Sequence, residues 1–253
     1  MNGAFYIGAT GLQAQQRALD IVANNITNMN TAGFKRSEVR FSELVGPPRP
    51  DDAPTSGAML AALLGVSADG TAKVFAPGEL KETGSPLDVA IAGEGFIELL
   101  GPAGETILWR GGTLKVNEDG FLAAANGLPL KAMISVPAEA TALSIDRAGE
   151  VRAATAGAAE PEALGRIELV RVTDADALTS LDGGLYRVAS EANLAAIDEE
   201  GAASLVQGSV ELSNVELTDE MVSLMMMQRA YAASAQLVQA GDQLMAIANG
   251  LKR

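Results

Sequence analysis

The 253-residue sequence contains no cysteine and no histidine. Disulfides, thiolate nucleophiles, zinc sites of cysteine and histidine, and acid–base chemistry that relies on an imidazole are therefore excluded. No apolar run reaches the roughly 18 residues that a membrane-spanning helix needs. The first residues, MNGAFYIGATGLQAQQ, lack the basic and compact apolar stretches of a secretory signal. We expect no membrane insertion and no cleavable signal peptide.

Aromatic residues are scarce, at 4%, so alanine, leucine and valine must supply most of the core, which an apolar content of 48% allows. Basic residues are outnumbered, and the formal net charge is −14. Because nucleic acids are bound through clusters of lysine and arginine, we exclude nucleic acid as a partner. The acidity itself is explained by a surface that keeps the protein soluble.

What the sequence does contain is an apolar repeat of seven residues at each end. The repeat comprises Phe5, Leu12, Leu19 and Ile26 at one end, and Leu217, Leu224, Tyr231, Val238 and Met245 at the other. This spacing predicts helices over 3–29 and 214–250 that favour partner helices, the second beginning with a capping box at Ser213–Glu216. Since one helix pair buries only one seam, each helix is expected to need further neighbours and to order on association.

The residue pattern between the two ends is different. Four prolines within Gly46–Pro54 predict an exposed connector over 46–57, whereas Met59–Val66 fits either a helical turn or a strand. From about 72 to 210, short apolar or alternating runs between turn residues predict antiparallel strands. The predicted fold class is α+β, with long N- and C-terminal helices pairing as a coiled-coil domain and a central antiparallel β sandwich or barrel-like domain. The domains are 1–45 with 208–253, a connector over 46–80, and 81–207.

Candidate chemistry is sparse. The carboxylate pairs Asp51/Asp52, Glu199/Glu200 and Asp219/Glu220 lie in polar stretches typical of a solvated surface. We predict no catalytic residue, no cofactor and no metal site. A rival hypothesis is a secreted β-domain hydrolase with a helical oligomerisation stalk, which requires a deep pocket of convergent polar groups. A third is an adhesin tethered by a coiled coil.

Three segments resemble the bacterial flagellar rod and hook proteins. Ala23–Lys35, reading ANNITNMNTAGFK, is similar to the N-terminal signature of that family. Gly84–Phe96, reading GSPLDVAIAGEGF, resembles the segment that opens the β domain, and SNVE at 213–216 with MQRAY at 227–231 resembles the C-terminal signature. Leu108–Arg110 departs from the aromatic-Thr-Arg strand common in the family, which bears on local packing only.

The resemblance implies a structural subunit of the flagellar basal-body rod, not an enzyme, that polymerises helically through its terminal helices into a torque-transmitting drive shaft. The implied partners are copies of itself, other rod and hook axial proteins, and the flagellar type III export apparatus that would carry it to the periplasmic rod. Gly165–Val170 and Asp182–Arg187 favour the proximal rod type, and Met227–Tyr231 favours the distal type. We predict the proximal type, with a distal-rod or hook-type protein as the alternative.

The heptad residues are our candidates for contacts between subunits, together with Asn24, Asn25, Gly33, Phe34, Gln228 and Arg229. The amides of Asn24 and Asn25 either cross-link neighbouring subunits, where a buried amide must find partners, or serve only in a helix C-cap and turn. Gly33 and Phe34 combine a backbone requirement with an aromatic anchor. For Arg229 the alternative is a solvated charge.

Overall fold

The computed structural model describes residues 2–45, 63–156, 160–174, 178–181, 183–188, 193–197 and 203–250. The chain divides into two compact units. Residues 1–27, 37–72 and 216–253 form the first, called here the helical unit, and residues 28–36 and 73–215 form the second, called the β unit. The predicted connector at 46–57 lies outside the described residues.

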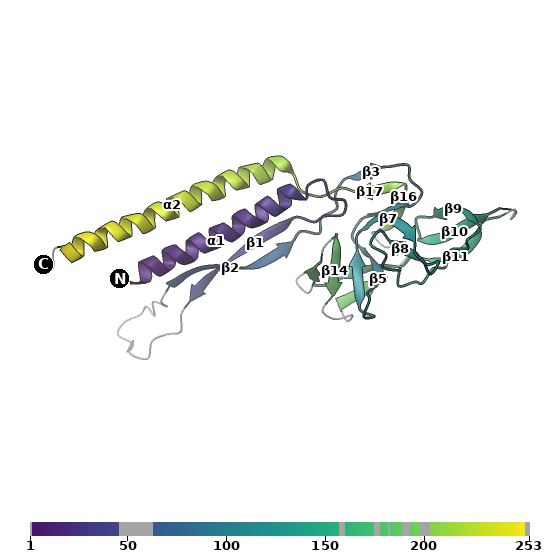
Figure 1. Ribbon diagram of the computed structural model, residues 1–253, viewed down its shortest axis with the longest axis horizontal. Helices are drawn as coiled ribbons and strands as arrows, with labels where there is room; N and C mark the ends of the chain where they lie inside the picture. The colour runs from purple at the N-terminus through teal and green to yellow at the C-terminus, as the bar shows by residue number, and fades with distance from the viewer. Residues whose placement is uncertain are drawn as a thin grey trace. The chain divides into compact units, whose positions relative to one another are not determined.

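The helical unit contains two long helices and a β ribbon (Figure 1). The helices are α1 (Asn2–Thr27) and α2 (Leu217–Gly250), and the ribbon pairs β1 (Ser37–Val45) with β2 (Leu63–Lys73). Helix α1 packs against both α2 and β1. Neither helix combines the length and the apolarity needed to cross a membrane, within the residues described.

The predicted fold class was wrong. Within the described ranges the chain has two helices but seventeen strands, so β structure dominates, and the helices do not form a separate coiled-coil domain because the ribbon shares their unit. The buried positions of α1 are Ala14, Ala18, Val22 and Asn25, whereas Leu12, Leu19 and Ile26 are only half-buried. Short alanine side chains let α1 lie close to two neighbours, which a leucine-filled heptad seam does not. The predicted helix start at Ser213 was also wrong, since α2 begins at Leu217.

The β unit contains short strands throughout its described length. They are β3 (Leu80–Glu82), β4 (Asp88–Ala92), β5 (Phe96–Leu100), β6 (Thr106–Trp109), β7 (Gly111–Val116), β8 (Leu122–Ala124), β9 (Ala140–Ile145), β10 (Glu150–Thr155), β11 (Glu162–Arg166), β12 (Leu169–Val172), β13 (Leu178–Ser180), β14 (Leu185–Val188), β15 (Leu194–Ala196), β16 (Ser204–Gln207) and β17 (Ser209–Glu211). Loops as short as the one at Asn117–Gly120, where Gly120 has φ +81°, join consecutive strands.

These strands assemble into antiparallel sheets. Six strands follow the order β13-β14-β6-β5-β12-β15, four follow β16-β4-β7-β8, and three follow β11-β10-β9. A fourth sheet pairs β17 with β3, placing Val210 opposite Lys81. The predicted antiparallel character of the central region is correct for these sheets.

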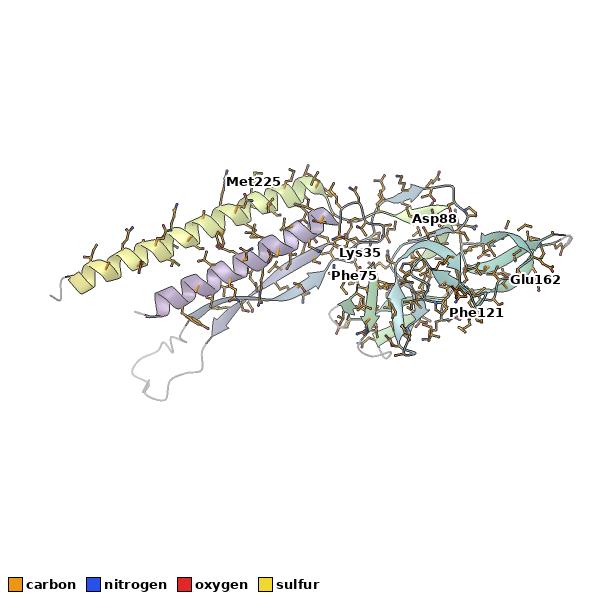
Figure 2. The ribbon with its side chains drawn as sticks, in the orientation of Figure 1. Lys35, Phe75, Asp88, Phe121, Glu162 and Met225 are labelled. Carbon is orange, nitrogen blue, oxygen red and sulfur yellow. The ribbon has the colours of Figure 1, made fainter. Side chains whose placement is uncertain are left out.

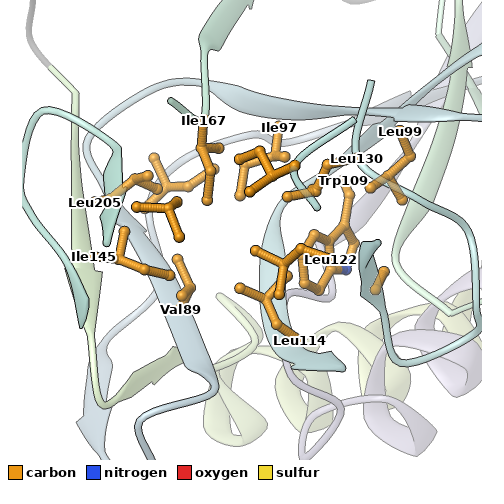
Figure 3. Packing of buried hydrophobic residues seen from close by; sticks show 14 of the residues in the cluster. Val89, Ile97, Leu99, Trp109, Leu114, Leu122, Leu130, Ile145, Ile167 and Leu205 are labelled. Carbon is orange, nitrogen blue, oxygen red and sulfur yellow. The ribbon is translucent and has the colours of Figure 1, made fainter. Parts of the chain in front are cut away.

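The six-stranded sheet is buried on both faces. Ile107 and Trp109 belong to the large apolar cluster shown in Figure 3, which the other sheets help to build. Leu108, between them, joins Phe96, Val170 and Tyr186 in a smaller cluster on the opposite face. Burial on both faces explains why Thr106–Trp109 is an apolar run with little alternation.

Candidate functional site

The two long helices meet along an antiparallel seam. Asn25 Nδ2 lies 3.3 Å from Glu220 Oε1, Gln15 Nε2 donates to Ser234 Oγ at 3.1 Å, and a Cβ atom placed on Gly8 would lie 2.7 Å from Val238 Cγ2. Small or short residues therefore let the backbones approach closely. Successive contacts join earlier residues of α1 to later residues of α2, so one face of α2 is committed to α1.

The opposite face of α2 is exposed and apolar. Its exposed side chains include Met225, which Figure 2 shows pointing away from α1. We define the outer face of α2 as Met221, Val222, Met225, Met226, Leu237 and Ile247, which are between 50% and 74% exposed. From Met221 to Gly250 the sequence has only two charged residues, Arg229 and Asp242. Several exposed large apolar side chains on one side of a helix are typical of a contact site for another macromolecule.

Asn25 holds the start of β1 against the end of α1. Its side chain is 1% exposed. The amide accepts a hydrogen bond from the Ser37 backbone N–H at 3.0 Å and donates to the Ser37 carbonyl at 2.9 Å. With Glu220 as a further acceptor, both ends of this amide have partners inside the subunit. This arrangement is not the C-cap and turn considered for Asn25, and a contact of Asn25 with a neighbouring subunit stays a prediction.

A buried ionic cluster lies inside the β unit. Glu211 lies at the end of β17. Its Oε1 pairs with Lys35 Nζ at 2.7 Å, and its Oε2 pairs with Arg110 Nε at 2.8 Å. The three residues are between 0% and 2% exposed. The Gly78 backbone N–H also donates to Glu211 Oε1 at 2.7 Å. We call Lys35, Arg110 and Glu211 the ionic cluster.

The remaining protons of the ionic cluster find backbone acceptors. Lys35 Nζ donates to the Ala76 carbonyl at 2.8 Å, and the Arg110 guanidinium donates to the carbonyls of Gly93 and Gly95. Burial lowers the pKa of Lys35, and the hydrogen bond and charge of Glu211 only partly offset that effect. Because Lys35, Gly78 and Arg110, from three segments distant in sequence, converge on Glu211, the cluster ties these segments of the β unit together.

The described residues form shallow cavities on the β unit. One of about 410 Å³ is lined partly by Glu98, Lys131, Arg166 and Glu168, and in it Lys131 Nζ already pairs with Glu98 Oε1 at 3.0 Å. No group of three carboxylates close enough to hold a metal ion occurs among the described residues.

The predicted interface residues fall into three classes. Gly33 and Phe34 are engaged within the β unit: Gly33 N donates to the Glu211 carbonyl at 2.8 Å, and Lys73 Nζ lies 4.6 Å from the Phe34 ring centre. The half-buried ones in the helical unit are Leu12, Leu19, Ile26, Leu224 and Val238, and the exposed ones are Asn24, Leu217, Gln228, Arg229 and Tyr231. The side chains of Phe5 and Met245 lie outside the described part.

Sequence reasoning missed the ionic cluster. The sequence offered one signal for the cluster: Lys35 closes the N-terminal signature, and Glu211 lies two residues before Ser213, where the C-terminal signature begins. Arg110 stands at the segment where this chain departs from the family pattern, and its guanidinium is nevertheless placed in the cluster. Asn214, from the C-terminal signature, likewise acts inside the β unit by accepting from the Arg36 backbone N–H at 2.8 Å.

Comparison with known proteins identifies three matching family models. Residues 5–35 match the flagella basal body rod protein model, residues 90–153 the flagellar hook protein FlgE/F/G D1 domain, and residues 206–251 the flagellar basal body rod FlgEFG protein C-terminal model. These matches cover α1, much of the β unit and α2.

Full-length relatives carry the same names. The chain is 30% identical to the flagellar basal-body rod protein FlgG of Caulobacter vibrioides, with 98% of this chain and 99% of that protein covered. It is 32% identical to FlgG of Borreliella burgdorferi over all of both chains, and 31% identical to FlgF of Caulobacter vibrioides over 94% and 93%. The chain therefore belongs to the flagellar basal-body rod protein family. It is a structural subunit of the rod, located in the flagellar basal body.

Proposed function

We propose that this rod subunit contacts copies of itself through the outer face of α2, and that it makes no chemical change. The single observation that carries the proposal is the exposure of Met221, Val222, Met225, Met226, Leu237 and Ile247 on the side of α2 turned away from α1. Burying a large apolar side chain contributes about 1.5–3 kcal/mol, so covering these six supplies a strong driving force for association.

The predicted interface residues extend this surface. Gln228 and Arg229 are exposed on α2, and Leu217 and Tyr231 are 41% and 39% exposed. Polar side chains at the border of an apolar patch fix the register of the contact, while the apolar residues contribute most of the free energy. Other rod and hook proteins and the type III export apparatus remain proposed partners, by family resemblance.

A charge placed on the outer face tests the proposal. Leu237→Glu and Met225→Glu should each abolish motility and rod completion in cells whose own copy is deleted, because association would bury an unpaired carboxylate. Val116→Glu is the matched control, since Val116 is 44% exposed but belongs to the β unit. Motility and electron microscopy of purified basal bodies are the readouts. Normal rods from Leu237→Glu cells would refute the proposed contact.

We also propose a position in the proximal part of the rod. The relatives named FlgG and FlgF are similar to the chain at 32% and 31% identity, so identity does not separate the two types. The support is the resemblance of Gly165–Val170 and Asp182–Arg187 to the proximal type. Fitting this chain into the density of purified basal bodies tests the position, and a fit confined to the distal part would overturn it.

A further inference from the structure

Methionine is concentrated on the exposed part of α2. Four of the nine methionines of the chain lie between Met221 and Met227. Met221, Met225 and Met226 are 53%, 53% and 57% exposed, whereas Met227 is half-buried. The exposed three belong to the outer face of α2, to which Val222, 50% exposed, and, further along the helix, Leu237, 74% exposed, also belong. Their thioether sulfurs are accessible in the free subunit.

We propose that Met221, Met225 and Met226 form an oxidation site through which peroxides block assembly of the free subunit. The inference rests on the proposed function, because it requires the outer face to be buried between copies. It concerns the subunit before assembly, when these side chains are exposed. In the assembled state the contact itself would shield them.

The modification is a two-electron oxidation of each sulfur. The thioether takes one oxygen atom from hydrogen peroxide, the O–O bond breaks, and water is released, leaving methionine sulfoxide. The product has a strongly polar S–O group on a formerly apolar side chain, and methionine sulfoxide reductases reverse the change. The reaction needs accessibility rather than an activated sulfur, and the three exposures meet that requirement.

The chemistry of the face explains why a sulfoxide would block association. A sulfoxide oxygen is a hydrogen-bond acceptor, and burying it without a donor is unfavourable. Val222, Leu237 and Ile247, the other members of the outer face, have no side-chain donor, and the donors beside them, Gln228 and Arg229, are those that the proposed contact uses to fix its register. Unmodified methionine suits such a surface well because its flexible side chain adapts to an irregular partner. The same residues that favour a contact thus make it sensitive to oxidation.

The test uses the purified full-length chain, with and without hydrogen peroxide, and follows self-association by sedimentation velocity over a concentration series. Peptide mass spectrometry locates the sulfoxides. We expect the concentration needed for association to rise by about tenfold or more after oxidation. Treatment with MsrA and MsrB should restore the original value.

Two variants assign the effect to residues. For M221L/M225L/M226L, the concentration needed for association is measured before and after peroxide treatment. The ratio of these two concentrations should be close to one because leucine has no sulfur. Met133→Leu, which removes a 46% exposed methionine of the β unit, should keep the full peroxide effect.

The outcomes separate this inference from the proposed function. Undiminished association of the wild-type chain carrying sulfoxides at the three positions would overturn the inference alone. Equal peroxide sensitivity of the triple variant would do the same, by placing the effect elsewhere. If the untreated wild-type chain stays monomeric throughout the series, self-contact through α2 is overturned, and the inference falls with it.

Discussion

At the scale of single residues, the most unusual feature of the β unit is a group of buried charged side chains. Glu211 is the only acidic member of the ionic cluster, and its two oxygens receive one lysine and one arginine. Buried ion pairs contribute little net free energy compared with apolar replacements, but removing one partner leaves an uncompensated charge in the interior. The cluster therefore specifies which segments meet, and it makes each of its members difficult to replace.

Glu211→Gln should lower the free energy of unfolding of the β unit by about 3–5 kcal/mol, because Lys35 and Arg110 would remain buried without a counter-charge. Urea denaturation followed by the fluorescence of Trp109, the single tryptophan, reports on this unit. Glu98→Gln breaks the more exposed pair with Lys131 and should cost only about 0–1 kcal/mol. Equal losses in the two variants would contradict the role given to the cluster.

Tyr186 makes the stability of the β unit depend on pH in the alkaline range. Its ring is buried and makes edge contacts with Phe75 and Phe96 at 5.3 and 5.7 Å. Burial raises the pKa of Tyr186 above its ordinary value of 10.0, and the charge of Arg110 opposes that effect only in part. The unfolded chain therefore loses the phenol proton first, and stability falls as the pH rises above 10.

Tyr186→Phe tests this linkage because it keeps the ring and removes the proton. Between pH 10 and 11 the wild-type chain should lose up to about 1.4 kcal/mol more than the variant, as measured by urea denaturation. Burial also lowers the pKa of Lys35 and of Lys73, but both lysines are common to the two proteins and cancel in the comparison. Parallel pH profiles would show that Tyr186 does not titrate as proposed.

At the scale of secondary-structure elements, the α1–α2 seam depends on close approach. Gly8 faces Val238, and an added Cβ would lie 2.7 Å from the valine methyl carbon, whereas Gly11 has no heavy atom within 4 Å of that position. The two glycines share a helix and differ mainly in this contact. They form a matched pair for measuring how tightly the helices pack.

Gly11→Ala should raise the stability of the helical unit by up to about 1 kcal/mol, because alanine favours the helix over glycine. Gly8→Ala should gain less or be destabilising, since Val238 must move to admit the methyl group. Thermal unfolding followed by circular dichroism at 222 nm measures both. A gain from Gly8→Ala equal to that from Gly11→Ala would mean that the seam is looser than described.

The elements also show what sequence can and cannot predict. Helices over 3–29 and 214–250 were expected, and α1 and α2 occupy Asn2–Thr27 and Leu217–Gly250, because uninterrupted apolar periodicity is a local signal. Short strands between about 72 and 210 were also expected, and Phe96–Leu100 is one of those observed. The ribbon of β1 and β2 was not predicted. Its second strand, Leu63–Lys73, contains two glycines, and the proline-rich segment separates it in sequence from its partner β1.

The candidate site was only partly predictable for the same reason. The exposed Met225 and Met226 follow from the sequence as helix positions that one partner cannot cover. Which face of α2 meets α1 depends instead on Gly8 and Gln15, whose sequence distance from α2 exceeds 200 residues. The ionic cluster joins residues from three separate regions, and no local pattern records such a meeting.

At the scale of the whole molecule, the net charge of −14 opposes association between copies. The proposed apolar contact through α2 has to overcome a general repulsion that dissolved salt screens. We expect self-association, measured by sedimentation velocity, to strengthen severalfold between about 50 and 500 mM sodium chloride. Weaker association at high salt would indicate that ion pairs, rather than the outer face, hold the copies together.

The long sequence separation between Lys35 and Glu211, 176 residues, has a consequence for timing. During translation, Glu211, the counter-charge for Lys35, is added only when about four-fifths of the chain has been made, and α2, the partner helix of α1, follows still later. Neither unit is complete before that point, because each contains segments from early and late in the chain. Synthesis order therefore delays the completion of both units until the last part of the chain has been made.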